Sequence, residues 1–174
     1  MGEVAHRLLQ AIRFDRDAYV WMDFNDRATG DALILVAITQ LLLIIGQGTS
    51  MFGLISGLPS VISALISAAV FWLIYSGLVY AAAKYLFQGY GAYATYLRIV
   101  GFAYPTLLLL LFTERVIDSP LLSFLLGSVW FVAIVAYGVH YIADLALGKA
   151  ASSALLGMVG WVIVSAILSG LRLF

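Results

Sequence analysis

His140 and Asp144 are the two residues whose types and spacing best suit chemistry in this sequence. They are four positions apart, so a helix would place them on one face. An imidazole beside a carboxylate can hold or pass a proton. A proton relay normally needs a longer chain of ionisable groups, and Asp144 is the one ionisable neighbour of His140 at helical spacing. We therefore interpret His140 as a hydrogen-bonded structural residue.

Other catalytic and metal-binding patterns are absent from the sequence. The chain has no cysteine and two histidines, which excludes thiolate nucleophiles and disfavours a multi-histidine zinc site. It contains neither the H-E-x-x-H zinc motif nor the G-x-S-x-G nucleophile elbow. A glycine-rich phosphate loop with a lysine is also missing. We therefore expect no enzymatic activity, no cofactor and no metal site.

The charged residues lie between long apolar runs. They make up 10% of the 174 residues, whereas about 25% of a typical soluble domain is charged. No Asp, Glu, Lys or Arg occurs from Ala32 to Ala83 or from Ala150 to Leu171. Such runs reach the roughly 20 residues that are needed to cross a hydrocarbon core of about 30 Å. The sequence therefore predicts a multi-pass integral membrane protein.

The predicted fold is all-α, a bundle of five transmembrane helices preceded by an amphipathic interfacial helix. Residues 1–30 hold this helix, from residue 3 to about 24, and a polar turn. Residues 31–174 hold the spans, at about 32–46, 61–86, 95–113, 121–147 and 151–172. We expect Asp31 or Thr29 to cap the first span. The N-terminal helix has two compatible interpretations: it lies on the membrane surface, or it covers one end of the bundle.

The connection 46–60 is rich in glycine, apolar and uncharged. Two positions are open for it: it rests among the lipid headgroups, or it enters the membrane as a re-entrant segment. Irregular backbone at membrane depth must be buried in protein or hydrated, which makes re-entrant segments rare. We therefore favour the headgroup position.

Lysine and arginine are distributed unequally between the two predicted sides of the membrane. With five spans, the N-terminus and the second and fourth loops share one side, which carries seven of the nine Lys and Arg residues. The other side carries Arg115 and Arg172. The excess of positive charge on cytoplasmic segments places the N-terminus in the cytoplasm and the C-terminus outside.

Six ionisable residues form a predicted polar cluster at the cytoplasmic ends of the spans. They are Asp31, Lys84, Arg98, His140, Asp144 and Lys149. Asp144 near a helix C-terminus, and Arg98 and Lys149 near helix N-termini, oppose the helix dipole. We therefore hypothesise that Asp144 pairs with Arg98 or Lys149. A structural ring of ion pairs is the favoured interpretation, and a ligand or ion site is the alternative.

A glycine and several aromatic residues precede a proline in the third span. The segment Tyr93 to Pro105 reads YATYLRIVGFAYP, and Gly148-Lys149-Ala150 precedes the fifth span. These segments and the five spans resemble the Yip family (Ypt-interacting proteins) in its short, prokaryotic type. The resemblance makes Gly101, Tyr104 and Pro105 candidate motif residues and implies a prokaryotic plasma-membrane protein.

One motif of the eukaryotic Yip members is missing. Those members carry an acidic-x-Tyr-Gly-Pro motif before the first span, whereas Asp17-Ala18-Tyr19 is followed here by Val20 and Trp21. The long N-terminal region of those members is missing as well. The binding of Rab-type GTPases that the family implies for its eukaryotic branch is therefore not carried over to this chain.

We expect a non-enzymatic membrane-organising or partner-binding protein. Its predicted contact surface is cytoplasmic and consists of Arg7, Arg13, Arg16, Trp21, Asp23 and Asp26. The expected partners are membrane lipids and either other membrane proteins or further copies of the chain, in a homo-oligomer. Nucleic acid is not expected, because the formal net charge is zero.

The alternative is a small-solute or ion transporter or channel, as a monomer or an oligomer. Loop 46–60, Pro105 and the His140–Asp144 pair support it. Against it, no ionisable residue falls near the middle of a predicted span, where ion-driven transporters usually carry one.

Overall fold

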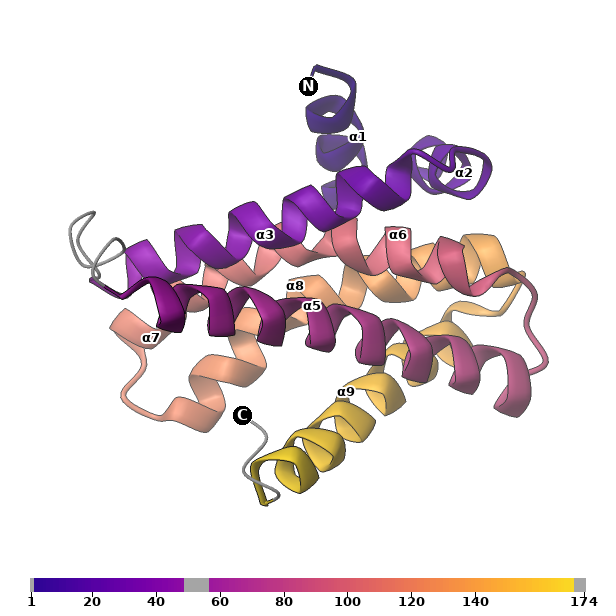
Figure 1. Ribbon diagram of the computed structural model, residues 1–174. Coiled ribbons are helices and arrows are strands. Elements are labelled where there is room, and N and C mark those ends of the chain that lie inside the picture. Colours follow the sequence, from indigo (N-terminus) through magenta and orange to yellow (C-terminus); the bar gives the residue numbers. More distant parts are fainter. Residues whose placement is uncertain (1, 49–56, 171–174) are drawn as a thin grey trace.

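The chain folds into helices that run alongside one another (Figure 1). The computed structural model describes residues 2–48 and 57–170, and these contain no strand. The two N-terminal helices are α1 (Gly2–Ile12) and α2 (Arg16–Phe24). The remaining segments are α3 (Ala28–Gly46), α5 (Leu58–Ala81), the π-helical turn η1 (Ala82–Leu86), α6 (Tyr93–Ala103), the 3₁₀ segment η2 (Tyr104–Leu109), α7 (Leu110–Val116), α8 (Pro120–Ala143) and α9 (Leu147–Gly170).

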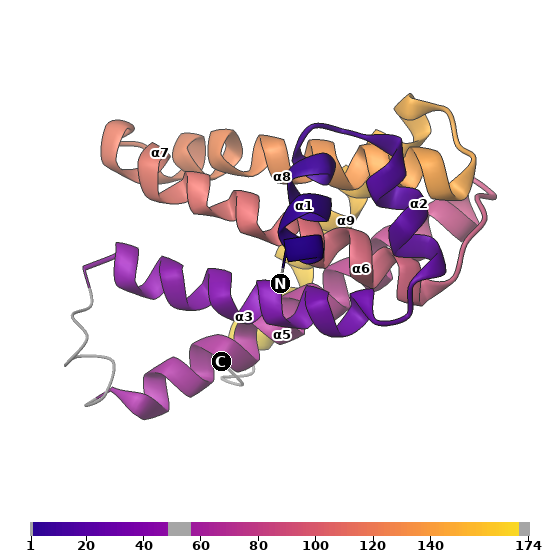
Figure 2. The same cartoon turned by 90° about the horizontal axis from the view of Figure 1, so that it is seen from above.

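Five of these helical stretches are long and apolar enough to cross a membrane, which confirms the predicted fold class. They are α3, α5 with η1, α6 with η2 and α7, α8, and α9. One end of the bundle holds the start of α3, α6 and α9 and the end of η1 and α8 (Figures 1 and 2). Lys84, Arg98 and Lys149 lie near it, so we call it the basic end.

The third span, α6, is the core of the bundle. Every residue from Thr95 to Ala103 is buried, and α6 packs against α3, α5 and α8. The outer spans instead expose large apolar side chains, for example Ile34 of α3 and Ile163 of α9. A surface of this kind suits contact with lipid, because water would not tolerate so large an apolar area. The buried residues therefore mark the centre of the bundle, and the exposed apolar residues mark an outer surface that suits contact with lipid.

Pro105 changes the helix type of the third span without ending the span. Proline has no N–H, so Pro105 cannot donate to the carbonyl of Gly101. The chain continues as the 3₁₀ segment η2 and then as α7. The Thr106 hydroxyl donates to the Ala103 carbonyl at 2.7 Å, which satisfies one acceptor at this change.

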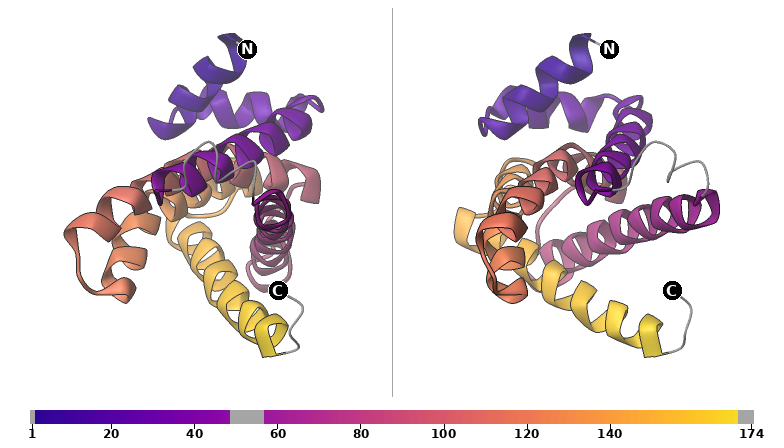
Figure 3. Two further views of the ribbon diagram at one scale, coloured as in Figure 1. Left: turned by 60° about the vertical axis from the view of Figure 1, so that its left-hand side comes forward. Right: turned by 90° about the vertical axis from the view of Figure 1, so that its left-hand side faces the viewer.

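The N-terminal segment forms two helices, so the prediction of one helix from residue 3 to about 24 was wrong. Phe14 has a left-handed backbone conformation, with φ of 60°, which ends α1. Asp15 then caps α2, because its carboxylate accepts from the N–H of Asp17 at 3.1 Å. In the views of Figure 3, α1 lies across the direction of the spans, and it packs against α2 and α6.

Two predicted helix ends also differ from the structure. The first span begins at Ala28, and Arg27 at its N-cap makes no side-chain cap, so neither Thr29 nor Asp31 caps it. The fourth span ends at Ala143, since Asp144 adopts the left-handed conformation that commonly follows a helix. Lys149 consequently lies in the first turn of α9 and not in the turn before it.

Some of the predictions cannot be compared with the structure. Most of the connection 46–60 falls on residues 49–56, outside the described residues, as does Arg172. The headgroup and re-entrant positions of that connection therefore both stay open.

Gly101 is a point of close approach between α6 and its neighbours. A Cβ atom built there would lie 2.4 Å from the Ala32 Cβ and 3.2 Å from the Trp72 Nε1. Trp72 Nε1 itself donates to the Leu97 carbonyl at 2.7 Å. Helices in membranes often approach closely at such small residues. Gly101 therefore allows α3 and α5 to pack against one level of α6.

We expect Gly101→Ala to lower the stability of the bundle by about 1–3 kcal/mol, because the added methyl group overpacks the α3–α6 contact. Gly30→Ala in α3 is the matched control, since nothing lies within 4 Å of its added Cβ. Thermal unfolding of both purified variants in detergent measures the effect. Equal melting temperatures for the two variants would contradict the close packing at Gly101.

Candidate functional site

Arg98 is a buried cation near the basic end of the bundle. It lies on α6, only 5% of its surface is exposed, and its guanidinium points toward the turn between α2 and α3. Buried arginines in proteins normally need both a counter-charge and several hydrogen-bond acceptors. The α2–α3 turn supplies both.

The guanidinium of Arg98 donates four hydrogen bonds to the end of α2, the turn that follows it and the start of α3. Nη1 donates to the carbonyls of Met22 and Asp23, at 2.9 and 3.0 Å. Nη2 donates to the Asp26 carboxylate at 2.7 Å, and Nε donates to the Thr29 hydroxyl at 2.9 Å. One side chain of α6 therefore fixes the end of α2 and the start of α3 together.

Two physical effects favour this arrangement. Met22 and Asp23 lie in the last turn of α2, where carbonyls lack partners within the helix and a cation is favourable to the helix dipole. The planar guanidinium presents several N–H groups in fixed directions, which a lysine ammonium cannot do. The Asp26 side chain is 99% exposed, so the counter-charge itself stays hydrated.

Further contacts attach α2 to the bundle. The Thr95 hydroxyl of α6 donates to the Asp23 carboxylate at 2.8 Å. The fully buried Tyr19 hydroxyl lies 3.2 Å from the Ala11 carbonyl and 3.3 Å from the Ile134 carbonyl of α8. Burial raises the pKa of Tyr19, so the phenol remains a neutral donor. We call α1 and α2 together, residues 2–24, the N-terminal platform.

The six residues of the predicted polar cluster do not come together as a ring of ion pairs. Within residues 2–48 and 57–170 the one ion pair joins Arg98 to Asp26, so the hypothesised pairing of Asp144 with Arg98 or Lys149 was wrong. The Lys84 ammonium donates to the Tyr80 hydroxyl at 2.6 Å. The ring of His140 contacts the Leu145 carbonyl, as expected for a structural histidine, and Asp144 is exposed.

The predicted contact surface divides into an outer and an inner group. Arg7 lies over the Trp21 ring, 5.4 Å from its centroid, and both line an open groove of about 560 Å³ on the platform. Arg13 and Arg16 are exposed. Asp23 instead accepts from Thr95, and Asp26, although exposed to water, pairs with Arg98.

The candidate motif residues of the third span make packing contacts. Gly101 meets Ala32, and Pro105 starts the 3₁₀ segment. The Tyr104 hydroxyl donates a long hydrogen bond of 3.4 Å to the Gln40 amide oxygen of α3. These positions therefore hold the third span against the first.

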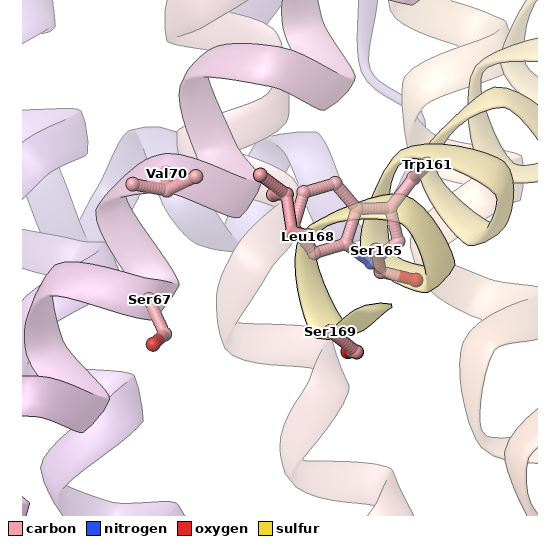
Figure 4. Close-up of a pocket in the computed structure, with 6 residues that line it drawn as sticks. All are labelled: Ser67, Val70, Trp161, Ser165, Leu168 and Ser169. Atoms are coloured by element: carbon pink, nitrogen blue, oxygen red, sulfur yellow. The ribbon is translucent and has the colours of Figure 1, made fainter. Parts of the chain in front are cut away.

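A small crevice lies between α5 and α9 (Figure 4). It is lined by Ser67 and Val70 of α5 and by Trp161, Ser165, Leu168 and Ser169 of α9. Its volume of about 90 Å³ is well below the roughly 300 Å³ at which ligand pockets begin. The Ser165 hydroxyl donates to the Val162 carbonyl of its own helix at 2.9 Å. The crevice is therefore a packing feature between two diverging helices.

Comparison of the chain with protein-family models, with curated proteins and with solved structures found no match in any of the three. Function is therefore inferred from the geometry of the platform and of its attachment through Arg98.

We expect Arg98→Leu to loosen the platform, because two α2 carbonyls and the Asp26 carboxylate lose their donors. Each buried carbonyl left unpaired costs about 1–3 kcal/mol, whereas the exposed Asp26 carboxylate is hydrated by water. Amide hydrogen exchange of residues 16–24 in detergent-purified protein should therefore become about tenfold faster or more.

Two further variants make this test specific. Arg98→Lys should also accelerate exchange, since an ammonium cannot reach all four acceptors. Asp144→Asn, an exposed acid at the same end, should leave it unchanged. Unaltered exchange in both Arg98 variants would show that the platform is held by other contacts.

Proposed function

We propose that this integral membrane protein is a non-enzymatic membrane organiser that acts through its N-terminal platform. In this proposal it is a short, prokaryotic-type relative of the Yip family, located in the plasma membrane, with its N-terminus in the cytoplasm. The observation that carries the proposal is the attachment of α2 to α6 by the four hydrogen bonds of Arg98.

The attachment supports this function because it presents one composite surface. The platform exposes Leu9, Val20 and Phe24, and Phe24 is 84% exposed. Arg7 lies on α1, Arg16 begins α2, and Arg13 lies in the connection between these two helices. Apolar side chains beside basic ones are typical of helices at the boundary between headgroups and acyl chains. Each basic residue near an anionic surface contributes about 1 kcal/mol to binding, and the interleaved acids Glu3, Asp15 and Asp17 offset much of this.

The orientation of α1 also supports an interfacial position. Its axis lies across the spans (Figures 1 and 3), as expected for a helix in the plane of a membrane that the spans cross. Within the platform, α2 adjoins the basic end, where the distribution of positive charge favours the cytoplasmic side.

The centre of the bundle gives little support to the transport alternative. Phe71 of α5 lies against Tyr75, Phe131 and Trp161, with ring centroids 5.4, 6.1 and 5.0 Å apart. Tyr104 of η2 approaches the same ring at 5.8 Å. Aromatic rings from four segments therefore fill the region between α5, η2, α8 and α9.

The proposed topology predicts opposite labelling of two single cysteines, which is a clean test because the chain has none of its own. In intact cells a membrane-impermeant maleimide should label Asp118→Cys, in the connection between α7 and α8, and should spare Asp17→Cys until the cells are opened. Labelling of both cysteines in intact cells would overturn the assignment of the N-terminus to the cytoplasm.

The lipid contact of the platform predicts selective quenching of a fluorophore on Phe24→Cys in proteoliposomes. Spin-labelled anionic lipid should quench it more than spin-labelled neutral lipid, because Arg7 and Arg13 attract the anionic headgroups. The double substitution Arg7→Gln, Arg13→Gln should reduce this preference. A fluorophore on Val116→Cys, 83% exposed at the opposite end, is the control. Equal quenching by the two lipids at Phe24→Cys would contradict a lipid-organising platform.

A further inference from the structure

A slot of ligand size separates α1 from α3. Its volume is about 380 Å³, within the range of roughly 300–1,000 Å³ found for small-molecule sites. Its apolar walls are formed by Val4, Ala5 and Leu8 of α1 and by Ile34, Leu35 and Ile38 of α3. The apolar face of α1 therefore does not close completely onto the first span.

Asp31 is the one polar side chain that lines the slot. It is half-buried and lies in the first turn of α3. Its carboxylate meets no cation within the described residues, because the ion pair there joins Arg98 to Asp26. A carboxylate at the mouth of an apolar slot attracts a cation that brings apolar surface with it.

The slot has one polar and one apolar end. From Asp31 to Ile38 it extends over seven residues of α3, which is about 10 Å along the helix. Ile34 and Ile38 are 51% and 46% exposed, so the slot opens onto the lipid-facing surface of the first span. An occupant with a cationic head at Asp31 would therefore extend its chain along these isoleucines into the membrane.

We propose that the slot binds a phospholipid with an ammonium headgroup, of the phosphatidylethanolamine type. The headgroup ammonium pairs with the Asp31 carboxylate, and the beginning of one acyl chain lies between α1 and α3. This deepens the proposed function, since it rests on α1 lying at the membrane surface. It is independent of the attraction of anionic lipid to Arg7 and Arg13 on the outer side of the platform.

The lipid can be tested on the full-length protein by native mass spectrometry from detergent. The two probes are phosphatidylethanolamine and the same lipid with its amine acetylated, which removes the positive charge and keeps the chains. We expect the wild type to retain the amine form about fivefold more, the size of effect that one partly exposed ion pair gives. Asp31→Asn should bring the ratio close to one, whereas Asp144→Asn should leave it at the wild-type value.

A second variant tests whether the acyl chain of the lipid lies between α1 and α3. Ala5→Trp fills the slot from the side of α1 and should reduce retention of both lipids. Equal retention of the two lipids by the wild type, a preference that survives Asp31→Asn, or undiminished retention of both lipids by Ala5→Trp would each overturn the proposal. None of these results would affect the quenching test at Phe24→Cys. A negative result for lipid binding in the slot is therefore distinguishable from a negative result for lipid contact by the platform.

Discussion

The arrangement of α1 and α2 on the bundle depends on the hydrogen bonds that the guanidinium of Arg98 donates. A cation at the core helix of a membrane protein is costly unless every donor finds an acceptor, and here the acceptors come from the last turn of α2, from Asp26 and from Thr29. The same bonds satisfy carbonyls that the end of α2 would otherwise leave unpaired. One contact thus stabilises the charge of α6 and the position of the platform.

Helix packing at the centre of the bundle depends on the size of the side chains there. Without a hydrophobic driving force between helices in lipid, packing depends on close approach and on hydrogen bonds. Gly101 allows a close approach to Ala32 of α3. Trp72 of α5 donates a hydrogen bond to the Leu97 carbonyl of α6. The 3₁₀ segment at Pro105 lies next to these contacts, so the third span changes its helix type where neighbouring helices surround it.

Function is proposed at the rim of this centre, where side chains change from buried to lipid-facing. α1 has basic and aromatic contacts on the side of α2 and an incompletely filled apolar contact on the side of α3. The two sides differ in charge: Arg7 is exposed to the outer groove, while Asp31 lies in the inner slot. α1 therefore borders two sites of opposite sign, one with Arg7 of α1 and one with Asp31 of α3, and in the proposed function these suit different parts of a membrane lipid.

The sequence by itself determined the five membrane-spanning helices, because long uncharged runs and the spacing of the remaining charges are local properties. It also pointed to Arg98, Asp26 and Gly101 one at a time. Only the tertiary structure paired Arg98 with Asp26, 72 positions away, since nothing in a chain pattern tells which acid meets a buried cation. Likewise, the break at Phe14 and the slot at Asp31 arise from how α1 and α2 fold back onto other helices, and helical periodicity carries no information about that contact.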